Sequence, residues 1–150
     1  MLPEGYEYSK SANLKQYEFY SKGPKGNIRK LISYSYIGTW DGHNFFNLGF
    51  GDYDQSGNQV LDLVITDNKD AYKVLATVAA TAVDFFKHQP NCGVIFEGST
   101  SARTRLYQMK IAEHYHEISK TFDIQGLTED GKWENFAKGV RYKGFFVRKK

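Results

Sequence analysis

Apolar and polar residues alternate with a period of two over much of the first 66 positions, which is the pattern of half-buried β-strands. After a short extended start at 6–9, the alternation predicts four strands, over 16–22, 28–37, 45–54 and 59–66. The first two are separated by Gly23-Pro24-Lys25-Gly26, because proline presets one turn dihedral and glycine permits positive φ. Four strands with short connections predict an antiparallel meander.

The period changes from two to 3.6 after Asp67. An apolar stripe predicts a helix over 70–88, capped by Asp67 or Asn68; the stripe consists of Val74, Leu75, Val78, Ala82, Phe85 and Phe86. A second stripe predicts a helix that ends near Lys120; its members are Tyr107, Ile111, Tyr115, Ile118 and Phe122.

Shorter elements surround the second helix. A strand is predicted at 94–97 before it, a strand at 122–127 after it, one helical turn at 133–136 and a last strand at 142–148. The chain is therefore predicted to be a single α+β domain over 1–150 with a mainly antiparallel sheet. In this prediction, an N-terminal four-stranded meander is followed by elements in the order helix, strand, helix, strand, strand, and the two main helices pack on one face of the sheet.

Composition and length favour a soluble, cytoplasmic protein. The 150 residues contain one cysteine, Cys92, so no intramolecular disulfide can form and the usage suits a reducing compartment. The first residues lack a basic and apolar signal pattern, and no apolar run reaches membrane-spanning length. No membrane association is predicted.

Charge is unevenly distributed along the chain. Residues 1–38 carry six Lys/Arg and three Asp/Glu, residues 39–70 carry one Lys and six Asp, and the last 25 residues carry seven Lys/Arg and three acids. Basic ends thus flank an acidic middle. This asymmetry suits either a polyanionic partner or internal pairing of the opposite charges.

The segment 98–105, Gly-Ser-Thr-Ser-Ala-Arg-Thr-Arg, is the main candidate site. It predicts a strand-to-helix turn with two arginines in the first helical turns, where the helix macrodipole favours anions over cations. Free backbone N–H groups, hydroxyls and guanidinium groups together make an inventory for phosphate or carboxylate binding. The predicted anion-binding residues are Ser99, Thr100, Ser101, Arg103 and Arg105.

Internal ion pairing is the alternative for these arginines, and it ranks ahead of a ligand site. Positions 103 and 105 are about 200° apart on a helical wheel, so one regular helix does not direct both side chains at one ligand. At least one arginine is then expected to pair with a carboxylate on or beside a predicted strand; the candidates are Asp52, Asp54, Asp62 and Glu97.

The first predicted hairpin combines charge with aromatic residues. A basic patch of Lys22, Lys25, Arg29 and Lys30 surrounds its turn, and the adjoining strands carry Tyr17, Tyr20, Tyr34 and Tyr36. Such a surface could neutralise phosphates and stack the bases of single-stranded nucleic acid. A solvated hairpin tip with tyrosines covering the sheet is the simpler explanation, because strands are enriched in tyrosine anyway.

Other chemistry has weak support. His114 and His116 are two positions apart and the other histidines are isolated, so no metal site is predicted. No catalytic residue and no cofactor is predicted either, since neither a nucleophile elbow nor a dinucleotide fingerprint is present. Asp52 and Asp54 share a strand face and could act on a phosphoester, although aspartates beside a turn usually form the turn.

Five segments of the chain, spread over nearly its whole length, resemble a family of small bacterial proteins known as a domain of unknown function. They are 21–26, 47–52, 73–79, 98–107 and 145–150, of which Gly-Ser-Thr-Ser-Ala-Arg-Thr-Arg-Leu-Tyr is the most specific. Ser101 stands where the resemblance leads us to expect proline, a favoured residue at a first helical position. The resemblance implies one intact domain and no particular activity.

Three hypotheses about function follow. The favoured one is a non-enzymatic binding or regulatory module for a phosphate-bearing ligand, with nucleic acid among the candidates. The second is a phosphoester-acting enzyme in which Arg103 or Arg105 stabilises charge and Asp52 or Asp54 is the base or metal ligand. The third is a protein-interaction component, either of a two-gene bacterial system or of a homodimer.

Overall fold

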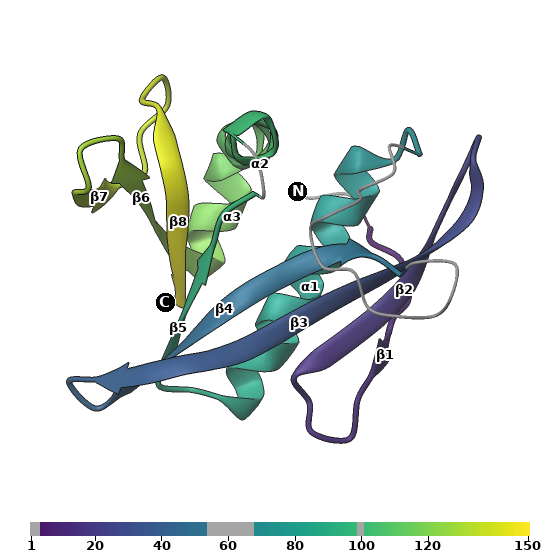
Figure 1. Ribbon diagram of the computed structural model, residues 1–150, viewed down its shortest axis with the longest axis horizontal. Helices are drawn as coiled ribbons and strands as arrows, with labels where there is room; N and C mark the ends of the chain where they lie inside the picture. The colour runs from purple at the N-terminus through teal and green to yellow at the C-terminus, as the bar shows by residue number, and fades with distance from the viewer. Residues whose placement is uncertain (1–3, 54–67, 99–100) are drawn as a thin grey trace. The chain divides into compact units, whose positions relative to one another are not determined.

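The described strands form one eight-stranded sheet in the order β1-β2-β3-β4-β5-β8-β6-β7 (Figure 1). The computed structural model describes residues 4–53, 68–98 and 101–150. The strands are β1 Ser9–Lys10, β2 Gln16–Gly23, β3 Gly26–Trp40, β4 His43–Asp52, β5 Cys92–Phe96, β6 Phe122–Thr128, β7 Trp133–Asn135 and β8 Tyr142–Lys149. The sheet is mostly antiparallel, with β4 and β5 parallel. With its helices, the chain is a single α+β domain, as predicted.

Within the described ranges, three helices accompany the sheet: α1 Ala71–His88, α2 Ser101–Glu113 and α3 Tyr115–Thr121. The predicted first helix is confirmed. The predicted second helix is divided at His114, which has φ −111° and ψ 17° and serves as the N-cap residue of α3. Its carbonyl accepts hydrogen bonds from the backbone N–H groups of Glu117 and Ile118. Ile111 and Ile118 are nevertheless both buried, so the predicted apolar stripe continues across the break.

The described residues divide into two compact units. The α1 unit contains residues 4–35, 48–53 and 68–90, and so includes β1, β2, α1 and parts of β3 and β4. The α2–α3 unit contains residues 36–47, 91–98 and 101–150.

Aromatic side chains form the core of the α1 unit. Tyr17, Phe19 and Tyr34 are buried on the strands. The ring of Tyr34 stacks on that of Phe85 of α1 at 4.1 Å, and its hydroxyl makes a buried 3.0 Å hydrogen bond with Thr81. Alternate strand residues and one face of α1 therefore supply this core, as the two periodicities predict.

The segment before α1 holds the β2–β3 turn instead of capping the helix. Asn68 is 1% exposed; its side-chain oxygen accepts from the backbone N–H of Lys25 at 2.8 Å, and its amide donates to Ser21 Oγ at 3.1 Å and Gly26 O at 2.9 Å. Asp70 is the N-cap residue and makes no side-chain capping bond. The predicted capping role of Asn68 is therefore wrong, because its polar groups are satisfied by the hairpin; Asp67 lies outside the described residues.

Strand β8 is central in the sheet of the α2–α3 unit. It pairs antiparallel with β5 through Ile95↔Phe146 and with β6 through Gln125↔Phe146. Helix α2 packs on β8 and α3 packs on β6. Fully buried Phe145 lies 5.2 Å from the ring of Phe96 and 6.2 Å from that of Tyr142. This face of the sheet is the packed core of the unit.

Three other predicted elements differ from the structure or cannot be compared with it. The stretch 38–44, predicted as a loop, belongs largely to β3 and β4, because Asp41 and Gly42 make a tight turn with φ of 53° and 77°, a combination typical of two-residue hairpin turns. The predicted helical turn at 133–136 is wrong: β7 pairs with β6 through Gln125↔Asn135. The predicted strand at 59–66 lies outside the described residues.

Candidate anion-binding site

A strand precedes a helix around the segment 98–105, as the sequence predicts. Strand β5 ends at Phe96 and α2 begins at Ser101, the position where proline was expected. Thr104 is 5% exposed, and its hydroxyl oxygen accepts from the backbone N–H of Gly98 at 2.9 Å. This side chain to backbone hydrogen bond ties Gly98, two positions after the end of β5, to the first residues of α2.

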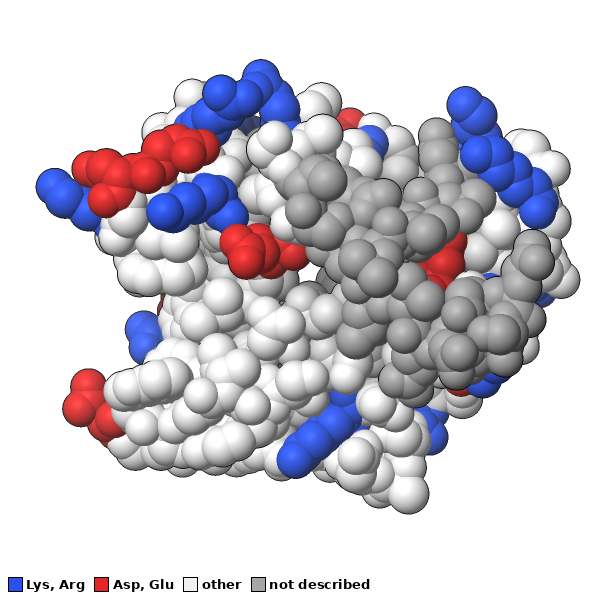
Figure 2. Space-filling view, viewed as in Figure 1, with Lys and Arg blue, Asp and Glu red and all other residues white. Residues whose placement is uncertain are grey.

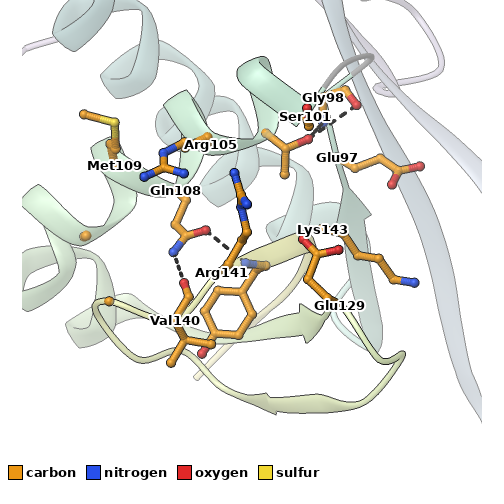
Figure 3. Close-up of a pocket in the computed structure, with 14 residues that line it drawn as sticks. Glu97, Gly98, Ser101, Arg105, Gln108, Met109, Glu129, Val140, Arg141 and Lys143 are labelled. Atoms are coloured by element: carbon orange, nitrogen blue, oxygen red, sulfur yellow. Dashed lines mark hydrogen bonds between the residues drawn. The ribbon is translucent and has the colours of Figure 1, made fainter.

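A pocket of about 570 Å³ opens beside this segment, and we call it the α2–β8 pocket (Figure 3). One side consists of α2, and the other of the residues at and before the start of β8, with Glu97 and Glu129 completing the lining. Two of the predicted anion-binding residues, Ser101 and Arg105, line it. Ser99 and Thr100 lie outside the described residues, as does the side chain of Arg103.

Gln108 joins the two sides of the pocket. Its amide nitrogen donates to the carbonyl oxygen of Val140, and its side-chain oxygen accepts from the backbone N–H of Tyr142 at 3.2 Å (Figure 3). The hydroxyl of Tyr142 in turn donates to Glu134 at 2.8 Å and accepts from the backbone N–H of Ala137 at 3.0 Å. Burial, and then the hydrogen bond to Glu134, raise the pKa of Tyr142. The β8 wall is thus held by a chain of hydrogen bonds.

Charges of both signs line the pocket. Arg105, Arg141 and Lys143 are its cations, and Glu97 and Glu129 are its carboxylates; all five side chains are exposed. On the face drawn in Figure 2, basic and acidic side chains lie close together over β6, β7 and β8, at the upper left. Three cations and two carboxylates leave one net positive charge in the pocket.

The two arginines of the pocket are not neutralised by the part of the chain that the structure describes. Neither Arg105 nor Arg141 makes an ion pair within 4.0 Å there. Figure 3 shows Arg105 on α2 extending toward Met109, and Arg141, just before β8, extending toward α2. Two arginines from different elements therefore line one pocket.

The predicted internal partners of the arginines behave differently. Asp52 is 5% exposed and is bound by Lys30 Nζ at 2.6 Å, within the α1 unit. Glu97 lines the pocket without forming an ion pair in the described region. Asp54 and Asp62 lie outside the described residues. Arg105 forms no ion pair with Glu97 in the described region, and the prediction that one of the two arginines pairs with a carboxylate stays a prediction.

The predicted basic patch on the β2–β3 hairpin is smaller than expected. Lys22, Lys25 and Arg29 are exposed, but Lys30 is 1% exposed and points its ammonium at Asp52, so its assignment to a surface patch is wrong. Arg29 donates to Glu18 at 2.9 Å and lies over the ring of Tyr53, 3.9 Å from its centroid. The hydrogen bond to Glu18 raises the pKa of Arg29.

The predicted stacking tyrosines separate into two classes. Tyr17 and Tyr34 are each 1% exposed and belong to the core, so neither can stack a base, and this prediction is wrong for both. Tyr20 and Tyr36 are 48% and 55% exposed. They lie in different units, Tyr20 in the α1 unit and Tyr36 in the α2–α3 unit.

Sequence reasoning missed Arg141 and Gln108. The only signal for Arg141 was the basic excess of the last 25 residues, which does not say which cation faces which element. Gln108 lies among ordinary polar helix residues, and its role depends on the packing of α2 against β8. Both residues become recognisable only when segments more than 30 positions apart come together.

The described residues contain neither a metal-binding cluster nor a membrane-spanning helix. Within the ranges that the structure describes, no group of three or more His, Cys, Asp or Glu side chains could hold a metal ion. No described helix is long and apolar enough to cross a membrane.

Comparison with known proteins identifies a family for the chain. No match was found among curated proteins, and none among solved structures. A family model described as a family of unknown function, DUF6934, matches residues 3–150. The chain therefore belongs to this family of unknown function.

Proposed function

We propose that the protein is a non-enzymatic binding module for a small phosphate-bearing ligand, which it holds in the α2–β8 pocket. One observation carries this proposal: Arg105 and Arg141 come from separate elements, line the same pocket and have no carboxylate partner among the described residues. Guanidinium groups bind phosphate oxygens in a bidentate manner, with charge-assisted hydrogen bonds.

The size of the pocket supports a small molecule. About 570 Å³ lies within the ~300–1,000 Å³ range of small-molecule sites. Ser101 adds a hydroxyl at the start of α2, where the helix dipole favours negative charge. The carboxylates of Glu97 and Glu129 suit a ligand that also carries hydroxyl or amino donors.

The alternative functions have less support. Phosphoester chemistry needed Asp52 or Asp54 beside the arginines, but Lys30 holds Asp52 and Asp54 is not described. Nucleic-acid binding by the hairpin has less support because Lys30, Tyr17 and Tyr34 are buried and cannot contact a ligand. A protein partner or homodimer stays a prediction.

Calorimetric titration tests the proposal. Inorganic phosphate, pyrophosphate and ATP serve as probes, with the full chain at low ionic strength. We expect at least one of them to bind, and Arg105→Gln or Arg141→Gln to weaken that binding about tenfold to a hundredfold, because each removes hydrogen bonds to a charged group worth ~1.5–3 kcal/mol.

Arg29→Gln is the matched control, since it removes an exposed arginine that is already paired with Glu18. It should leave the affinity unchanged. Absence of binding by all three probes, or equal affinity in the Arg105, Arg141 and Arg29 variants, would contradict the proposed function.

A further inference from the structure

A row of aromatic rings crosses the sheet face that is opposite to the core of the α2–α3 unit. Trp40 lies 5.0 Å from Phe45, Phe45 lies 5.8 Å from Phe146, and Phe146 lies 6.2 Å from Trp133, measured between ring centroids. We call these four residues the aromatic stripe. They come from β3, β4, β8 and β7, so segments about 90 positions apart in the sequence build one surface.

Gly93 of β5 makes the stripe continuous. A Cβ at this position would lie 2.3 Å from the Phe146 ring and 3.3 Å from the Phe45 ring. The two rings therefore meet directly above the glycine backbone, which a side chain would prevent. Strand β5, which lies between β4 and β8, has no side chain at Gly93, and the two rings occupy the space above it.

The stripe differs from the packed core in its exposure. Adjacent Phe145 points to the opposite face and is fully buried, whereas Trp40 and Trp133 at the two ends of the stripe are 55% and 43% exposed. Successive side chains of a strand alternate between faces, so β8 places Phe145 in the core and Phe146 in the stripe. The stripe is a contiguous, partly exposed apolar surface, the kind of feature that marks an interaction site when polar groups border it.

Polar groups suited to nucleic-acid bases and phosphates lie on the same face. Gln125 of β6 is paired in register with both Phe146 and Asn135, and paired residues share a face, so the amides of Gln125 and Asn135 lie on the face that carries Phe146. Arg148 follows Phe146 by two positions on β8 and shares its face. Its contact with Asp123, at 3.6 Å between mostly exposed groups, is a weak one that a phosphate can replace.

We propose that the aromatic stripe binds single-stranded nucleic acid, with bases stacked on Trp40 and Trp133 and a phosphate on Arg148. Stacking on aromatic rings beside cations is the general mode of single-strand binding, and amides hydrogen-bond the exposed base edges. The stripe by itself is too small for a second copy of the chain: four partly exposed rings offer at most about 400 Å², whereas a stable interface buries ~800 Å² per partner.

The chain carries its own reporter for this test, because its two tryptophans are Trp40 and Trp133. Titration with oligo(dT) of about 12 nucleotides, within the ~4–16-nucleotide range of single-strand sites, should quench the intrinsic fluorescence. Anisotropy of the labelled oligonucleotide gives the affinity. We expect Trp40→Ala and Trp133→Ala each to weaken binding about 5- to 150-fold. Arg148→Gln should lower the slope of log affinity against log salt concentration by the amount that corresponds to about one phosphate contact.

Two controls separate this site from other surfaces. Tyr20→Ala removes an equally exposed aromatic residue outside the stripe and should leave the affinity unchanged. Arg141→Gln, which impairs the proposed pocket, should also leave it unchanged, so the stripe and the pocket can fail independently. Circular dichroism shows whether the variants are folded, and Trp133→Phe, which keeps a stacking ring, should retain most of the affinity.

Three outcomes would overturn the proposal. One is the absence of salt-sensitive binding at low ionic strength. Another is equal affinity for the single strand and for a duplex of the same length, because paired bases cannot stack on the rings. The third is self-association, measured by sedimentation, that both tryptophan-to-alanine variants abolish.

Discussion

Two pairs of cations, one pair from each unit, have opposite surroundings. In the α1 unit, Lys30 is buried against Asp52 and Arg29 is held by Glu18. In the α2–α3 unit, Arg105 and Arg141 line a pocket without an ion pair among the described residues. The same residue types are thus held by carboxylates in one place and are exposed without an ion pair in the other. Charge on a sequence therefore indicates function only after its internal partners are known.

The largest expected effect comes from breaking the buried pair. Asp52→Ala leaves the Lys30 ammonium buried without its carboxylate partner, and loss of one member of such a pair costs about 3–5 kcal/mol of unfolding free energy. Urea denaturation measures it. The double variant Lys30→Met/Asp52→Leu should recover much of the loss, because it removes both charges; a single variant as stable as the wild type would show that the pair is unimportant.

A smaller effect is expected at the hydrogen bonds that join the sides of the pocket. Gln108→Ala removes the bonds to Val140 and Tyr142, which should cost about 1–3 kcal/mol of stability. Affinity for the phosphate probe should fall as well, since Arg141 loses its support. Denaturation and calorimetry on the same sample compare the two losses. Unchanged affinity in a folded variant would mean that Gln108 does not position the arginine.

The response of stability to alkaline pH tests Tyr8 of the α1 unit. Burial, and then the hydrogen bond to Asp84, raise the pKa of Tyr8 from 10.0 to about 12, so its protonated form is favoured in the folded state. The resulting contribution of Tyr8 to the free energy of unfolding is fully present below pH 10 and is lost as pH rises toward 12. Tyr8→Phe should therefore make unfolding free energy fall less steeply over this range. A slope identical to that of the wild type would contradict the shift.

The smallest effect is expected at the hairpin surface. Glu18→Gln removes the carboxylate that Arg29 binds, but the arginine side chain is 42% exposed, and exposed pairs contribute about 0–1 kcal/mol. Thermal denaturation should show a shift close to the error of the measurement. A loss as large as that of Asp52→Ala would erase the distinction between the buried and the exposed pair.

Regular elements were predictable where a side-chain period extends over several turns or residues. Helix α1, strand β6 and strand β8 follow the predicted positions closely because each buries one face, and burial imposes a period of 3.6 or two. Short elements were not: β7 contains three residues, and its pairing with β6 decides its conformation. The break at His114 likewise has no marker in the apolar stripe, which continues through it.

The candidate site was predictable only in part. The strand-to-helix turn and Arg105 were expected, but Arg141, Gln108 and the aromatic stripe depend on contacts between distant segments. The amino-acid sequence by itself determined the α+β class and the positions of most strands and of α1, because local periodicity records which face is buried. Only the tertiary structure decided which cations are paired, because a lysine such as Lys30 and an arginine such as Arg105 differ in neighbours that the chain brings from elsewhere.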